Sequence, residues 1–425
     1  MFAKTILDNG IRVVSQEMAD HRSVSLGIWV ENGSRHESNH QNGISHFIEH
    51  LLFKGTTGRT AAQIAEEMDA VGGVLNAFTA KEHTCYYAKV LDENLPLAID
   101  LLTDIFLNSV FDAEEIDRER SVILQEISQA EDAPDDYVHD LFSLDFFKDH
   151  PLARPICGRA ETVSSFRRED FLQFFESRYR PSRVIVSAAG HLRHDAVVEE
   201  MAARLGSVAR GNDLFAALPS ESEAVPEIRN GVFSHPKTLE QVHLCLGVAG
   251  IPQSHPQRYA AYVLNTLLGG GMSSRLFQEI REKRGRAYSV YSFSSSYKDV
   301  GCVGIYAGTS MEWVEEVVDL ILKEAKSLAH GKIKMEELRR TQGQLVGGMM
   351  LGLESTDSWM SHIARNEIYF GEPVTVDEIC SRVRAVSLDD VVDLARQLFG
   401  SGAMTLCLLG DFKGDVKFKS LDRGL

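Results

Sequence analysis

The chain has 425 residues, of which 44% are hydrophobic and 25% charged. That length exceeds what one hydrophobic core usually serves, so we expect a globular protein with two or more domains. The formal net charge of −17 argues against nucleic acid as a partner, because phosphates require clustered Lys and Arg. No apolar run approaches the roughly 18 residues that span a bilayer, so no membrane contact is expected.

The N-terminus and the cysteines predict a cytoplasmic protein. Asp8 interrupts the first residues too early for the apolar region of a signal peptide. The cysteines are scattered, form no C-x-x-C pair and often lie in apolar stretches. We interpret them as small buried side chains in a reducing compartment. They are Cys85, Cys157, Cys245, Cys302, Cys380 and Cys407.

Strand and helix patterns alternate along the first half of the chain. Asp8-Asn9-Gly10 separates two short apolar runs and predicts a hairpin. Alternation of apolar residues over 23–31 predicts a half-buried strand. Thr60 and Gln63 form a capping-box pattern that starts a helix ending near Gly72. Further elements are expected as a helix over 43–53, strands at 74–79 and 84–91, a long helix from 112 to 134, a strand at 183–190 and a helix to about 205.

Residues 206–230 mark the predicted division of the chain. They mix polar residues with two prolines and show no hydrophobic period, which is typical of a linker. We therefore predict an N-terminal domain over 1–210, a linker over 211–230 and a C-terminal domain over 231–425.

The second half resembles the first, which indicates an internal duplication. The strand pattern at 23–30 resembles 240–248, and the helix "SHFIEHLLFKG" lines up with "AAYVLNTLLGG" (260–270) when Leu51-Leu52 is set on Leu267-Leu268. In this alignment the polar residues of the first copy lose their counterparts: His46, Glu49 and His50 face Tyr262, Asn265 and Thr266. The fold therefore does not require the polar triplet.

The stretch "HFIEH" at 46–50 is a candidate metal site. Positions i and i+4 share one helix face, so His46 and His50 can present two imidazole nitrogens to a cation at roughly 2 Å each. Neutral imidazoles suit zinc, whereas calcium and magnesium prefer oxygen. Glu49 lies on the same side, beside the position where a metal would activate water. Two solvated histidines on an ordinary helix are the alternative.

A catalytic zinc ion normally takes three protein ligands, so a third must come from elsewhere. Glu119 and Glu126 share a face of the long predicted helix. Apolar residues around Glu126 indicate that it turns inward, where a buried carboxylate needs a partner such as a metal. Glu119 is flanked by Arg118 and Arg120 and has more the character of a surface charge.

These residues carry a resemblance to a known family. In order and spacing, "HFIEHLLFKGT", "LNAFTAKEHTCYYAKV" and "ERSVILQEI" resemble the pitrilysin/insulysin-type inverted (H-x-x-E-H) zinc metallopeptidases. The nearest branch is that of mitochondrial processing peptidase and its bacterial relatives. The family has a further glutamate at a spacing that Glu126 matches, 76 positions after His50. The resemblance implies one Zn²⁺ per chain on His46, His50 and Glu126, with Glu49 as general base and Glu119 as a supporting catalytic residue.

Two further stretches extend the resemblance to substrate binding. Residues 269–293 resemble a family segment whose arginine and tyrosine reach toward the bound peptide, here Arg281 and Tyr288. The resemblance implies that Tyr288 also stabilises the oxyanion during catalysis. Residues 72–79 resemble the family's edge strand, which binds peptide by strand addition, so Asn76 and Phe78 are candidate substrate-binding residues.

The resemblance covers essentially the whole chain and implies its fold and function. It implies an α+β fold of two homologous α/β-sandwich domains, which together make half of a clamshell. Since the family encloses peptides with four such domains, we expect a homodimer, with a heterodimer of related chains as the alternative. The implied function is a zinc endopeptidase that cleaves peptides or unfolded, presequence-like segments. A non-catalytic partner subunit and a zinc-stabilised binding module are the rival functions.

Overall fold

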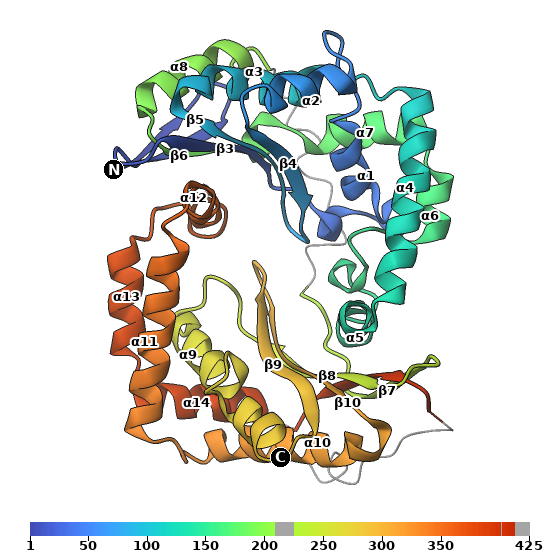
Figure 1. Ribbon diagram of the computed structural model, residues 1–425, viewed down its shortest axis with the longest axis vertical. Coiled ribbons are helices and arrows are strands. Elements are labelled where there is room, and N and C mark those ends of the chain that lie inside the picture. The colour runs from blue at the N-terminus through green and yellow to red at the C-terminus, as the bar shows by residue number, and fades with distance from the viewer. Residues whose placement is uncertain (209–224, 401, 413–425) are drawn as a thin grey trace. The chain divides into compact units, whose positions relative to one another are not determined.

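Two mixed β-sheets, each covered by helices, form the centres of two structural units (Figure 1). The computed structural model describes residues 1–208, 225–400 and 402–412, so most of the predicted linker 211–230 lies outside the described residues. Unit 1 comprises Met1–Gln129, Arg154–Ala224 and Gly352–Pro373. Unit 2 comprises Ala130–Ala153, Val225–Leu351 and Val374–Leu425. No described helix is both long and apolar enough to cross a membrane.

Unit 1 is built on a six-stranded sheet with the order β1-β2-β6-β3-β5-β4. Strands β2 and β6 are parallel, and the other neighbours are antiparallel. The strands are β1 (Phe2–Ile6), β2 (Arg12–Glu17), β3 (Ser23–Val30), β4 (Val74–Thr79), β5 (Thr84–Leu91) and β6 (Val184–Gly190). The helices are α1 (Ile44–Leu51), α2 (Ala61–Asp69), α3 (Leu95–Asn108), α4 (Ala113–Asp132, in this unit to Gln129), α6 (Ala160–Ser165), α7 (Arg168–Arg178), α8 (His194–Leu205) and α12 (Thr356–Phe370).

Unit 2 repeats this topology with five strands in the order β7-β11-β8-β10-β9. Strands β7 and β11 are parallel and the rest antiparallel, which matches β2-β6-β3-β5-β4 pair by pair. The strands are β7 (Gly231–Pro236), β8 (Val242–Gly250), β9 (Ala287–Ser296), β10 (Gly301–Thr309) and β11 (Thr405–Gly410). The helices are α5 (Pro134–Phe146), α9 (Arg258–Gly269), a π-helical turn (Phe277–Glu282), α10 (Val314–Ala329), α11 (Met335–Gly352), α13 (Val376–Ala385) and α14 (Leu388–Phe399). The two α/β units thus agree with the predicted duplication.

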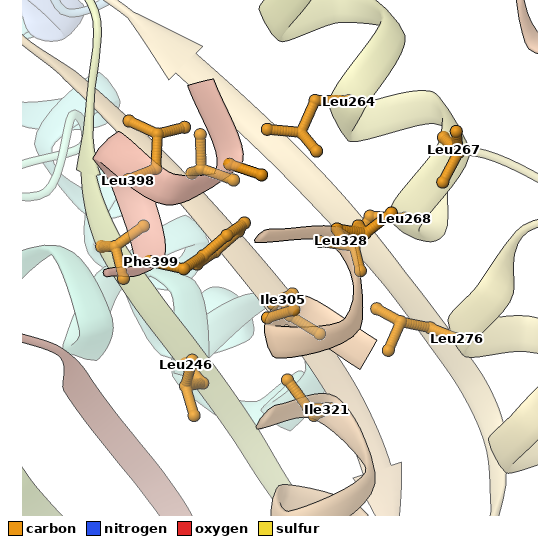
Figure 2. Close-up of a cluster of buried hydrophobic side chains, with 14 of the residues drawn as sticks. Leu246, Leu264, Leu267, Leu268, Leu276, Ile305, Ile321, Leu328, Leu398 and Phe399 are labelled. Carbon is orange, nitrogen blue, oxygen red and sulfur yellow. The ribbon is translucent and has the colours of Figure 1, made fainter. Parts of the chain in front are cut away.

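The main core of each unit lies between one sheet face and its helices. Figure 2 shows this core in unit 2, where side chains of strands β8 and β10 meet those of α9, α10 and α14. The labelled members are Leu246, Leu264, Leu267, Leu268, Leu276, Ile305, Ile321, Leu328, Leu398 and Phe399. In unit 1 the equivalent core holds α1 against β4 and β5. All six cysteines are free and five of them are buried, as the sequence pattern predicted.

The reverse face of each sheet is covered by a helix from the other half of the chain. In unit 1, α12 places Met360 and Ile363 against Trp29. In unit 2, α5 packs against β8 and β11 through residues such as Phe142. Since α5 follows α4 as α12 follows α11, the two copies exchange equivalent helices. Each unit is therefore built from both halves of the sequence. The predicted division into 1–210 and 231–425 places α5 and α12 in the wrong units.

This exchange corrects the prediction of a half-buried strand at 23–31. In β3 every residue after Ser23 is buried, because α12 covers the face that was expected to meet solvent. Gly27 permits the close approach, since an added Cβ would lie 2.9 Å from the Met360 sulfur. The small residues that alternate with apolar ones in β3 do not face solvent. They leave room for helix α12 to pack against the strand.

Ile363→Ala should therefore destabilise unit 1, because Ile363 packs behind strand β3, which lies more than 300 residues earlier in the sequence. Ile363 is 3% exposed within the α12 contact, and removing such a buried side chain costs about 2–5 kcal/mol. Urea unfolding followed by circular dichroism measures the loss, and hydrogen exchange should rise in β3 and β6. Arg365→Ala, at an exposed position of the same helix, is the matched control. Unchanged exchange in β3 would contradict the packing role of α12.

Candidate metal centre

Helix α1 separates apolar from polar side chains cleanly. It buries Ile44, Phe47, Ile48 and Leu51 in the core of unit 1. His46, Glu49 and His50 therefore point to the other side, where they are only partly buried. The helix begins after Gly43, whose φ of 97° is a conformation that glycine adopts without strain.

A buried carboxylate holds the start of this short helix. Glu37 is 2% exposed, and its carboxylate accepts hydrogen bonds from the backbone N–H groups of Gly43 (2.8 Å) and Ser45 (2.9 Å). The Asn42 amide donates to the same carboxylate at 3.2 Å. These bonds satisfy N–H groups that the helix leaves without partners, and the negative charge lies at the positive end of the helix. Glu37 thereby fixes the position of α1.

Helix α4 brings the third predicted ligand to the two histidines. Glu126 Oε2 lies 3.7 Å from His46 Nε2 and 3.6 Å from His50 Nε2. The ligand atoms of the three residues all lie within 4.8 Å of one another. A tetrahedral ion with ligands at ~2.1 Å separates them by ~3.4 Å, so this spacing fits a zinc ion with little movement.

A hydrogen bond orients the His50 imidazole to present Nε2, and burial keeps the His46 imidazole neutral. His50 Nδ1 donates to Glu119 Oε2 at 3.0 Å, which leaves the Nε2 lone pair free toward Glu126. Lys54 holds the other oxygen of Glu119 at 2.7 Å. Burial, with a contribution from His50, lowers the pKa of His46 to about 4. His46 is therefore neutral near pH 7, as a metal ligand must be.

Glu49 lies beside this cluster on the same helix. The Thr79 hydroxyl at the end of β4 donates to Glu49 Oε2 at 2.5 Å and fixes its orientation. Burial raises the pKa of Glu49, and the bond from Thr79 opposes that rise. A hydrogen bond from the Thr79 backbone also favours the charged carboxylate.

The burial of the two α4 glutamates differs from the sequence interpretation. The side chain of Glu119 is 7% exposed, whereas that of Glu126 is 39% exposed. Glu119 was expected to resemble a surface charge because arginines flank it. Those arginines turn away: Arg118 pairs with Glu114 and Glu115 on its own helix, and Arg120 donates to backbone carbonyls. Lys54 and His50 provide the polar partners that make the burial of Glu119 possible.

Asn76 and Phe78 lie on β4 but on the face away from the cluster. Their cross-strand partners Tyr87 and Cys85 belong to the face that α12 covers. Phe78 is half-buried and packs edge-on to Trp29, with ring centroids 5.4 Å apart. The exposed Asn76 accepts a hydrogen bond from the Ala77 N–H at 2.8 Å. The structure thus brings the β4 edge to the metal cluster through Thr79 and leaves these two side chains on the other face.

Arg281 and Tyr288 belong to unit 2 and lie together. The Arg281 guanidinium stacks 4.7 Å from the centroid of the Tyr288 ring, and Tyr288 is 78% exposed. Arg281 comes from the π-helical turn and Tyr288 from the start of β9. The two side chains contact each other, and their action at the metal cluster stays a prediction.

The second copy of the triplet has no metal-binding character. Tyr262 of α9 packs against the core, and its hydroxyl accepts from Gln253 at 3.3 Å. Among the described residues, α9 contributes nothing to any cluster of metal-ligating side chains. The scaffold is thus repeated without the site, as the alignment predicted.

Three supporting residues escaped the sequence analysis. Thr79 orients Glu49, Lys54 holds Glu119, and Glu37 holds the start of α1. Lys54 lies one turn after His50, a spacing that could have suggested a role. Thr79 reaches Glu49 only through the tertiary structure, and Glu37 reaches the start of α1 through the fold of the preceding loop. No motif in the sequence marks either residue.

Two related α/β units, one of which gathers two histidines and a glutamate beside a second glutamate, fit a zinc metallopeptidase. Residues 12–160 match the family model described as insulinase (peptidase family M16), and residues 165–345 match that of the peptidase M16 inactive domain. The chain belongs to peptidase family M16. The metal cluster lies in the first matched region, and the copy without it lies in the second.

Relatives in several bacteria carry the name of zinc protease. The chain is 43% identical to the uncharacterized zinc protease YmxG of Bacillus subtilis, over 94% of this chain and 96% of the relative. It is 42% identical to the uncharacterized zinc protease SCO5738 of Streptomyces coelicolor, over 96% of this chain and 90% of the relative. The crystal structure of a protease from Helicobacter pylori shares the fold, with a TM-score of 0.89 at 22% identity over 96% of this chain and 99% of that one.

Glu119→Ala should weaken zinc binding without removing a ligand. Losing the carboxylate that orients a ligating histidine typically costs about 10–100-fold in metal affinity. Competition with a chromophoric chelator measures this change. Glu114→Ala, at an exposed position of the same helix, should leave the affinity unchanged. Equal affinities for the two variants would show that the bond from His50 to Glu119 does not support the metal.

Proposed function

We propose that the protein is a zinc-dependent endopeptidase in which His46, His50 and Glu126 hold the ion and Glu49 is the general base. One observation carries the proposal. Three ligand atoms converge with the spacing of a zinc site, beside a carboxylate that is not itself needed as a ligand. A purely structural metal would leave Glu49 and its bond from Thr79 without a purpose.

The chemistry is hydrolysis of a peptide bond. When bound, zinc supplies a Lewis acid that polarises the scissile carbonyl and makes water acidic enough to react near neutral pH. Glu49 takes a proton from the attacking water and later passes it to the leaving amine. Thr79 keeps the carboxylate turned toward that water. Glu119 keeps His50 in the tautomer that presents Nε2.

The β4 edge is the proposed binding surface for the peptide. β4 is the last strand of its sheet, paired only with β5 among the described residues. An extended peptide can pair with its free edge through main-chain hydrogen bonds, which tolerate many sequences. The Ala77 N–H, now bonded to the Asn76 side chain, would be taken by the peptide, which releases the Asn76 amide to bind substrate.

Arg281 and Tyr288 are proposed to act from a second chain. The family resemblance implies four α/β units around a peptide chamber, and this chain contributes two. We therefore propose a homodimer in which the exposed Tyr288 of one chain donates a hydrogen bond to the oxyanion formed at the other chain's metal site. Unfolded or presequence-like segments are the proposed substrates, since only an extended chain can add to an edge strand.

Glu49→Gln should abolish hydrolysis and keep zinc. The amide cannot accept the proton from water, so cleavage of a quenched peptide should fall by about 10²–10⁴-fold, while zinc content stays at the wild-type level. Glu66→Gln on the exposed face of α2 is the control and should retain activity. Wild-type cleavage by the Glu49 variant would refute the base. A zinc-loaded wild type that cleaves no peptide would favour the non-catalytic partner subunit.

Mixing two inactive variants tests the dimer. If Tyr288 acts across the dimer, chains carrying Glu49→Gln and chains carrying Tyr288→Phe should form mixed dimers with one intact site. About a quarter of wild-type activity should return, because half of the dimers are mixed at equal concentrations and each has one working site. Two pools of Glu49→Gln chains, mixed in the same way, are the control. No recovery despite subunit exchange would show that Tyr288 acts within its own chain or not at all.

A further inference from the structure

A second cluster of metal-ligating side chains lies in unit 2, on the reverse face of its sheet. Asp145 comes from the exchanged helix α5, His235 from β7 and Cys407 from β11. One donor atom from each lies within 4.8 Å of the others, the same criterion that the candidate zinc site meets. Asp145 Oδ2 and His235 Nε2 are 2.8 Å apart, and the Cys407 thiol hydrogen-bonds to Asp145.

The cluster is buried but has an entrance. Cys407 is fully buried, and the side chain of Asp145 is 10% exposed. The His235 side chain is 32% exposed, so solvent reaches the group from one side. An ion could therefore enter past His235 and find a thiol and a carboxylate beneath it.

Unit 1 provides an internal comparison for this cluster. Glu367 on α12 follows the buried Met360 by seven positions, as Asp145 on α5 follows the buried Val138. Glu367 pairs with Lys4 at 2.7 Å and Arg12 at 3.5 Å. In unit 1, the polar contact between the exchanged helix and the sheet thus consists of ion pairs, beside the apolar packing of α12.

The residues of unit 2 offer more than ion pairs. The strand register places Cys407, opposite Cys245, where unit 1 has Ser187, opposite Gly27. Ser187 only accepts a hydrogen bond from the Trp29 indole. Where unit 1 pairs its acid with two bases that do not ligate metals, unit 2 offers carboxylate, imidazole and thiol together.

We propose that Asp145, His235 and Cys407 form a second metal site, specific for a zinc-class dication, that fastens α5 to the sheet of unit 2. Oxygen, nitrogen and sulfur donors suit zinc or cobalt, whereas calcium and magnesium take oxygen ligands. Water completes the coordination on the exposed side of His235. Binding expels the thiol proton and the proton between Asp145 and His235, and these two side chains move apart from 2.8 Å to ~3.4 Å.

Cobalt titration of the metal-free full-length protein tests the site. Cobalt bound to a thiolate gives a sulfur-to-metal charge-transfer band in the near ultraviolet, which the His46–His50–Glu126 site cannot produce because it has no sulfur. We expect two equivalents of Co²⁺ per chain and this band. Cys407→Ser should remove the band and one equivalent, while Glu126→Gln should keep the band.

Two matched variants separate the metal site from the ion pair. Cys245→Ser removes the neighbouring buried thiol on the same face and should keep the band. His235→Lys copies the acid–base pair of unit 1, so it should keep the folded state, seen by circular dichroism, and lose the band. Absence of the band in the folded wild-type protein at saturating Co²⁺, or its persistence in His235→Lys, would overturn the proposal.

Discussion

The chemistry of this protein depends on how one eight-residue helix is held. Helix α1 is too short to be stable alone, and it is fixed by four buried apolar side chains and by the buried Glu37 at its start. Because the apolar face is fully committed to the core, His46, Glu49 and His50 have one direction left. Glu126 on α4 then completes the cluster by lying close to the two histidines.

The duplicated fold explains how a scaffold and a site can be separated. The two sheets share strand order and direction, and the helix equivalent to α1 is present in both units. Yet in the alignment of the two halves, Tyr262, Asn265 and Thr266 occupy the positions of His46, Glu49 and His50. The reverse faces differ in the opposite sense. Unit 2 gathers Asp145, His235 and Cys407, whereas in unit 1 Glu367 pairs with Lys4 and Arg12. The exchanged helices make the two halves of the chain depend on each other for folding, because each sheet has one face covered by a helix from the other half.

Features that depend on neighbouring residues were predicted correctly from the sequence. Features that depend on tertiary contacts were not. Residue spacing alone predicts three features. They are the capping box of Thr60 and Gln63, the strands β4 and β5, and the helix that carries Glu119 and Glu126. The apolar faces of α5 and α12 could be seen, but nothing in their pattern says which sheet they cover. The same limit applies to Glu119, whose burial depends on Lys54 and His50, and to Glu37, which reaches α1 only through the folded loop. Recognition of the family supplied the role of Glu119 that the residues alone did not.

The central claim is that zinc binds where α1 and α4 meet in unit 1. Anomalous diffraction at the zinc edge, from crystals of the zinc-loaded full-length protein, tests it most directly. The account predicts a strong anomalous peak at about 2 Å from His46 Nε2, His50 Nε2 and a Glu126 carboxylate oxygen. A zinc-loaded crystal with no peak between these three residues would contradict it.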